Sequence, residues 1–132
     1  MPDHIACHVV FPARQVLEEN DYNVFPPDLE ADELVFFHAT AAEDVESILR
    51  SGLQPGIKLG RELTTISFAD KSAWALHHWV TVRNGRDGVI LALQFDNRDE
   101  LSYQSGTYYS RELKSQPRVI AMCPVPSTYK HI

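Results

Sequence analysis

The sequence predicts an α+β domain with a mainly antiparallel β-sheet and two short helices. Apolar runs of strand length, rich in Val, Ile, Leu and Phe, are separated by polar and Gly/Pro-rich segments. Two other segments have the apolar spacing and the boundary residues of amphipathic helices. Because strands and helices do not alternate regularly, a parallel α/β sheet is not indicated. The expected strands are residues 34–37, 63–69, 89–95 and 119–123, and the expected helices are residues 41–51 and 71–82.

The composition is that of a small acidic globule. The chain has 132 residues, with 12 Lys and Arg against 18 Asp and Glu, and a net charge of −6 with neutral histidines. This balance argues against a protein that holds duplex nucleic acid by counterion release. No apolar run approaches the ~20 residues of a membrane span, and the N-terminus lacks the pattern of a secretory signal. We therefore expect a single-domain cytoplasmic protein with no membrane partner.

Residues 1–33 are expected to form an N-terminal arm packed on the domain of residues 34–132. Residues 4–11 are rich in Val and Ile and can form a short strand. The run Phe25-Pro26-Pro27 blocks regular pairing. The acid-rich residues 28–33 are expected to be a solvated loop.

The strand at residues 34–37 is followed by a helix whose two ends are marked in the sequence. Thr40 and Glu43 have the spacing of a capping box, which predicts that the helix begins directly after Thr40. Gly52 is expected to end this helix in a left-handed conformation. The apolar stripe of the helix is formed by Val45, Ile48, Leu49 and Leu53.

The second half of the chain carries the second helix and the last two expected strands. Asp70 is expected to cap the helix at residues 71–82. A turn at residues 83–88 leads into the strand at residues 89–95. Residues 96–116 are polar and carry no strand prediction.

Cysteine and histidine spacing predicts no metal site. The two cysteines lie near opposite ends of the chain, so we expect reduced thiols. His4, Cys7 and His8 have metal-ligating residue types, but a structural zinc site needs four ligands. His77 and His78 are adjacent on an expected helix, where neighbouring side chains point about 100° apart and chelate poorly.

His38 is the first candidate for a functional side chain. It stands between a strand end and a helix start, where the strand fixes the side chain and the helix offers unpaired N–H donors. The alternative is a structural histidine whose ring nitrogens are satisfied by neighbouring backbone. Spacing alone does not decide between the two.

Three segments of the chain are similar to motifs of one known enzyme family. Phe37-His38-Ala39-Thr40 and the helix end Ile48-Leu49-Arg50-Ser51-Gly52-Leu53 are similar to the family's His-Gly-Ser/Thr and Ile-Leu-x-x-Gly-Leu. Thr65-Ile66-Ser67-Phe68-Ala69-Asp70, followed by Lys71-Ser72-Ala73, is similar to its Gly-Ile-Tyr-Phe-Ala-Asp strand and Ser-Ala helix start. Residues 119–129 are similar to its final strand, with Val125-Pro126-Ser127-Thr128-Tyr129 like the exit from that strand. In this order, the three motifs resemble the catalytic fold of the ADP-ribosyltransferases, in the branch of diphtheria toxin and the poly-ADP-ribose polymerases. The likeness covers residues 34–132 and implies a split antiparallel sheet.

The resemblance implies that NAD is the substrate and that no metal takes part. In this family the bond between nicotinamide and ribose breaks through an oxocarbenium-like transition state, which the enzyme orients and stabilises. His38 would bond an NAD ribose hydroxyl, the backbone of Ala39 would bond the nicotinamide carboxamide, and Thr40 would support the turn. The same resemblance places Ser67 and Ser72 at the cofactor site.

Arg61 is a candidate for the pyrophosphate of NAD. It lies, with Lys58, in the loop expected to cover the dinucleotide, and a cation there would pair with the phosphate charge. The alternative is a solvated surface arginine.

The sequence departs from the family pattern at three positions. Ala39 replaces a glycine, so a methyl group is expected where the ligand passes closely. Ser67 replaces the tyrosine that stacks on nicotinamide. No acid stands at residues 116–118, where the family has its catalytic glutamate, so Glu112 is the candidate catalytic acid, with a plain surface glutamate as the alternative. The rings that could replace the missing tyrosine are Tyr103, Tyr108 and Tyr109.

The function that the resemblance implies is mono-ADP-ribosyl transfer from NAD to a protein or nucleic-acid acceptor. One alternative is a catalytically inactive module of the same fold that binds NAD or ADP-ribose, or a plain interaction domain. Another is an enzyme similar to the RNA 2′-phosphotransferases, in which Arg61, Arg111 and Arg118 would bind the phosphate.

Overall fold

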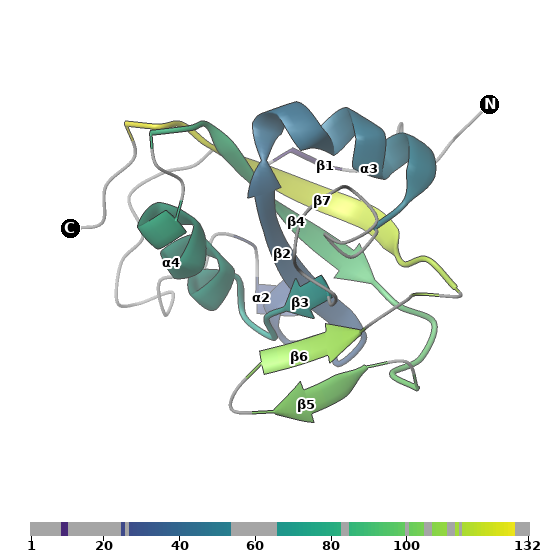
Figure 1. The fold of residues 1–132 in the computed structure, drawn as a ribbon. Coiled ribbons are helices and arrows are strands. Elements are labelled where there is room, and N and C mark those ends of the chain that lie inside the picture. The colour runs from purple at the N-terminus through teal and green to yellow at the C-terminus, as the bar shows by residue number, and fades with distance from the viewer. Residues whose placement is uncertain are drawn as a thin grey trace.

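A computed structural model describes most of the chain from residue 25 onward, together with one short strand before it (Figure 1). The described residues are 9–10, 25, 27–53, 66–82, 85–99, 101–104, 107–110, 113 and 115–128.

The fold is α+β and mainly antiparallel, which confirms the predicted class. A four-stranded sheet has the order β1 (Val9–Val10), β7 (Arg118–Val125), β4 (Gly88–Gln94) and β2 (Val35–Ala41). Its pairs are antiparallel except β1 with β7. A three-stranded antiparallel sheet has the order β3 (Ile66–Phe68), β6 (Thr107–Ser110) and β5 (Ser102–Gln104).

The β5–β6 hairpin was missed by the sequence analysis. Its strands are short and rich in Ser, Thr, Gln and Tyr, so they carry little of the apolar signal that marks a buried strand. Strand β4, in contrast, has a strong apolar signal in the sequence. It lies between β7 and β2, and every residue from Gly88 to Leu93 is buried, as expected for a central strand.

Each face of the four-stranded sheet buries its own apolar cluster. Helix α4 (Ser72–Val82) packs on one face, where Leu76 and Trp79 meet Phe37. The other face, which bears Phe36, is covered by α3 (Val45–Ser51) and by the three-stranded sheet (Figure 1). The alternation of side chains along β2 therefore sends neighbouring residues to different cores.

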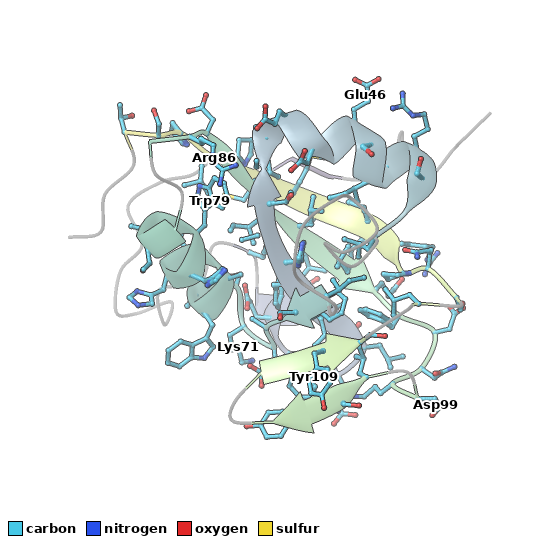
Figure 2. All side chains as sticks on the ribbon, viewed as in Figure 1. Glu46, Lys71, Trp79, Arg86, Asp99 and Tyr109 are labelled. Atoms are coloured by element: carbon cyan, nitrogen blue, oxygen red, sulfur yellow. The ribbon has the colours of Figure 1, made fainter. Side chains whose placement is uncertain are left out.

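A close approach of α4 to β4 explains one glycine. A Cβ at Gly88 would lie 2.1 Å from the Trp79 ring, so no larger residue fits there without a shift. The guanidinium of Arg86 lies 5.4 Å above the same ring (Figure 2). The indole packing thus connects the helix to the turn that precedes β4.

The capping-box prediction was wrong. Thr40 pairs with Val89 in the β2–β4 ladder, and the extended strand continues to Ala41. The helical segment begins with a 3-10 turn, Ala42–Asp44, and no side chain caps it or α3. Gly52 confirms the predicted end of the helix and the positive φ, at 83°, and its N–H donates to Ile48 O at 2.8 Å, but its ψ of 175° differs from that of an αL cap.

The prediction of a solvated loop at residues 28–33 was confirmed for the exposed turn at residues 31–33 and was wrong for residues 28–30. Helix α2 (Pro27–Glu30) occupies part of this stretch, and the Glu30 side chain is buried. Phe25 stacks on Phe37 with ring centroids 5.5 Å apart. Phe25 and Glu30 of the arm are therefore buried against the domain, while Asp28 and residues 31–33 are exposed.

Helix α4 begins one residue later than predicted and has a different cap. Ser72 N donates to Glu30 Oε1 at 3.1 Å, and the Ser72 hydroxyl donates to Glu30 Oε2. Lys71, at the start of the helix, donates from Nζ to Glu30 O at 2.8 Å (Figure 2). The carboxylate that binds the helix N-terminus thus comes from α2, not from Asp70.

Candidate functional site

The two sheets part where β2 and β3 diverge. Phe37 and Ala69 exchange two backbone hydrogen bonds of 2.8 Å, which form an isolated antiparallel bridge. A continued ladder would pair Ala39 with Ser67 next. Instead, His38 Nδ1 lies 2.8 Å from Ser67 O. The His38 ring therefore bonds the Ser67 carbonyl, which in a continued ladder would accept from the backbone N–H of Ala39.

This contact determines the tautomer of His38. A carbonyl oxygen only accepts hydrogen bonds, so Nδ1 carries the proton and donates. In the neutral ring, Nε2 is then an acceptor, and no described residue donates to it. The half-buried ring lies 5.8 Å from the Phe68 ring. A structural role thus explains the hydrogen bond of Nδ1, and Nε2 can still accept a hydrogen bond from a hydroxyl group.

The surroundings of His38 favour the neutral ring. Burial lowers its pKa below the ordinary value of 6.5, and the charge of His78 lowers that pKa further. The bond to Ser67 opposes these two effects in part.

The free energy of unfolding is expected to fall as the pH drops through about 6.5. The unfolded chain protonates His38 at a higher pH than the folded chain, so stability present above pH ~6.5 is lost below it. Urea unfolding at pH 7.5 and 5.5 measures this difference, and His38→Gln should reduce it. His77→Gln, an exposed neighbour on α4, is the control. Equal slopes in wild type and His38→Gln would contradict the prediction.

Ala39 presents its backbone groups toward the point of divergence. The backbone of Phe37 bonds Ala69 and so faces β3, and N–H and C=O directions repeat every second residue of a strand. Ala39 therefore faces the same side, and within the described residues no β3 backbone group pairs with it. Its methyl group packs against the apolar cluster under α4. The Ala39 methyl group thus packs on the core under α4, while the Ala39 N–H and C=O point toward the gap between β2 and β3.

Thr40 does not lie in a turn, and Ser72 does not lie at the surface. Thr40 is a half-buried strand residue, on the same face of the sheet as His38. Ser72 is fully buried, and its hydroxyl donates to Glu30. Arg61 and Glu112 lie outside the described residues, as does Lys58.

The β3–β6 register distinguishes the three tyrosines. Ser67 is exposed, and its cross-strand partner on the same sheet face is Tyr109 (Figure 2). Tyr108 lies on the opposite face, with its ring 4.8 Å from Phe36. Tyr103 lies beside Tyr108, also at 4.8 Å. Tyr109 is therefore the tyrosine placed next to Ser67, a distinction that needed the strand register.

Gln116 has a structural contact that sequence reasoning missed. Its Oε1 accepts from Leu53 N at 2.9 Å, and its Nε2 donates to Leu53 O at 3.1 Å and to Leu113 O at 3.4 Å. The amide thus joins the end of α3 to the segment before β7. Arg118 donates to the Gln94 side chain on β4.

Within the described residues, no three His, Cys, Asp or Glu side chains form a group that could hold a metal ion. His4, Cys7 and His8 lie outside this part of the chain. Cys123 is buried on β7. None of the helices in the described ranges has both the length and the apolarity needed to cross a bilayer.

Comparisons with known families, curated proteins and solved structures found no match. The likeness to the ADP-ribosyltransferases therefore rests on the sequence motifs alone.

Proposed function

We propose that this chain is an NAD-dependent mono-ADP-ribosyltransferase that modifies a protein or nucleic-acid acceptor in the cytoplasm. The observation that carries the proposal is the adjacency of His38 and Ala39 at the divergence of β2 and β3. There, one ring acceptor and one backbone donor–acceptor pair have no partner among the described residues.

These groups match the hydrogen-bonding needs of NAD. The nicotinamide carboxamide has an oxygen that accepts and an NH2 that donates, which complements the N–H and C=O of Ala39. A ribose hydroxyl can donate to Nε2 of His38. Because this imidazole is neutral, it offers a lone pair without adding a positive charge near the cationic pyridinium ring.

Other residues complete the proposed site. Tyr109 would stack on the nicotinamide ring beside Ser67. Arg61 would bind the pyrophosphate. Glu112, two residues after β6, would supply the negative charge that stabilises the developing oxocarbenium ion. Ser72 would not contact NAD, because its side chain is fully buried and its hydroxyl donates to Glu30.

A second candidate function is an inactive NAD or ADP-ribose binding module. The observation that favours it is the use of Gln116 as a structural amide within residues 116–118, where the resemblance would put the catalytic glutamate. Such a module would bind the ligand but would release no nicotinamide.

We expect saturable binding of NAD with release of nicotinamide, and we expect His38→Ala to weaken NAD binding at least tenfold. The expected loss follows from removal of the Nε2 acceptor and of the ring that lies against Ser67. Calorimetric titration with NAD and ADP-ribose measures binding, and chromatography of the nicotinamide product measures turnover.

His77→Ala is the matched control, since it removes an exposed imidazole from α4. Circular dichroism checks that both variants fold. Binding without nicotinamide release would support the inactive module. Absence of binding by both ligands would contradict both functions.

A further inference from the structure

The guanidinium of Arg98 lies over two aromatic rings, where the loop after β4 meets the three-stranded sheet. Its Cζ is 5.2 Å from the centroid of the Phe36 ring and 5.2 Å from that of the Tyr108 ring. Phe36 is buried and Arg98 is exposed, so the cation covers the apolar cluster from the solvent side. None of the described carboxylates forms an ion pair with Arg98. Its position is therefore held by ring contacts, and its charge is available to an anion.

The backbone on both sides of Arg98 is also held. Asn97 Oδ1 accepts from Asp99 N at 2.9 Å, and Arg98 O accepts from Leu101 N at 3.1 Å. Leu101 packs against the same apolar cluster that contains Phe36. Because the side chain and its loop are already ordered, binding of an anion to the guanidinium requires little further loss of conformational entropy.

An exposed ring adjoins this cation. Tyr103 lies on β5, at the edge of the three-stranded sheet, and is 62% exposed (Figure 1). Its ring centroid is 4.8 Å from that of Tyr108, which also contacts Arg98. Trp74 on α4 is exposed to a similar extent, but no described ring or cation lies against it. The Arg98–Tyr103 surface, formed by Arg98, Tyr103 and Tyr108, thus combines a preorganised cation with an accessible ring.

We propose that the Arg98–Tyr103 surface binds single-stranded nucleic acid. An unpaired base stacks on the exposed ring of Tyr103, as bases of single strands stack on aromatic side chains. A backbone phosphate of the same strand pairs with Arg98, because the planar guanidinium can donate two parallel hydrogen bonds to phosphate oxygens. One ligand therefore uses both features of the surface.

The charge of the chain favours a single strand over other anionic partners. Asp96 and Asp99 are exposed in the same loop, and the net charge is −6, so attraction of phosphates or carboxylates through charge alone is weak. Stacking contributes binding free energy that does not depend on charge. A duplex keeps the faces of its bases inside the helix, and an acidic peptide has no base, so both lose this contribution.

The Arg98–Tyr103 surface lies beside the proposed NAD site. Phe36, under the Arg98 guanidinium, and His38 lie on the same face of β2, two residues and roughly 7 Å apart along the strand. Use of the surface to hold the acceptor rests on the proposed function, whereas binding itself requires no NAD.

The test measures the fluorescence anisotropy of labelled single-stranded RNA and DNA of about 10 nucleotides, without NAD and at low salt. We expect saturable binding that Tyr103→Ala weakens about tenfold and Arg98→Gln weakens about fivefold. Tyr103→Phe keeps the ring and should bind within about twofold of wild type. Trp74→Ala, which removes the exposed ring on α4, is the matched control and should leave the affinity unchanged.

Absence of binding by wild type would overturn the proposal, as would equal affinities of wild type, Tyr103→Ala and Arg98→Gln. Tighter binding of a duplex or of oligoglutamate of the same length would also overturn it. NAD turnover by a protein that binds no oligonucleotide would refute this surface and leave the transferase function standing. Oligonucleotide binding without NAD turnover would refute the transferase function and leave the surface standing.

Discussion

Glu30→Ala is expected to lower the free energy of unfolding by about 3 kcal/mol, because it leaves buried donors without an acceptor. The carboxylate accepts from the backbone N–H and the hydroxyl of Ser72, which is fully buried, and also from the backbone of Phe25. It provides the cap of α4, so its loss also weakens the link between α2 and the helix. Urea unfolding at pH 7 measures the change.

Two further variants distinguish the loss of the α4 cap from a general loss of stability caused by changing a residue of α2. Asp28→Ala removes an exposed carboxylate from the same helix and should cost less than about 0.5 kcal/mol. Glu30→Gln keeps an acceptor oxygen for Ser72 N and should cost less than Glu30→Ala. Equal stability of Glu30→Ala and Asp28→Ala would show that the carboxylate does not cap α4.

The same carboxylate adds a pH dependence of defined sign. Burial raises the pKa of Glu30 above 4.5, and the hydrogen bonds from Ser72 and Phe25 and the charge of Lys71 offset part of that rise. The folded state therefore holds this proton more tightly than the unfolded state, so stability decreases as the pH rises through the interval above 4.5. Glu30→Gln should abolish this part of the slope.

Gln116→Glu is expected to cost about 2 kcal/mol, because it removes two hydrogen bonds that the amide donates. A carboxylate cannot donate to Leu53 O or Leu113 O, and it would set a negative charge against these two carbonyl oxygens. Urea unfolding measures the loss. An acid at this position would therefore disturb the end of α3 before it could act on a substrate.

Gln94→Glu is the matched control on the neighbouring strand. The Gln94 side-chain oxygen accepts from Arg118, so a carboxylate there keeps its donor and gains an ion pair. Its effect should lie within about 1 kcal/mol. If both glutamate variants were equally stable, the two donor bonds of Gln116 would contribute nothing measurable.

Local sequence predicted the elements whose signals lie within a few residues. Strand β4 is a run of apolar residues, and Gly52 stands where a residue of positive φ ends α3. The capping box failed because the β2–β4 ladder kept Thr40 extended against Val89. Tertiary pairing thus overrode a local signal.

For the candidate site, too, some features could be predicted from the sequence and others depend on the tertiary structure. The motif around His38 could be recognised in the sequence, as could its position at the end of an apolar run. The bond to Ser67, the outward N–H and C=O of Ala39 and the choice of Tyr109 all depend on where β2, β3 and β6 lie relative to one another. Strand register is set by contacts between distant residues, so the sequence left these three points open.

By itself, the sequence determined the α+β class, the central strand, the glycine cap and the histidine to examine. Only the tertiary structure decided that Glu30 caps α4, that Gln116 bonds Leu53, and that the two sheets part beside His38. The partners in these contacts are 29 to 63 residues apart. Hydrogen bonds over such separations depend on how the whole chain packs, whereas propensity and periodicity describe only neighbours.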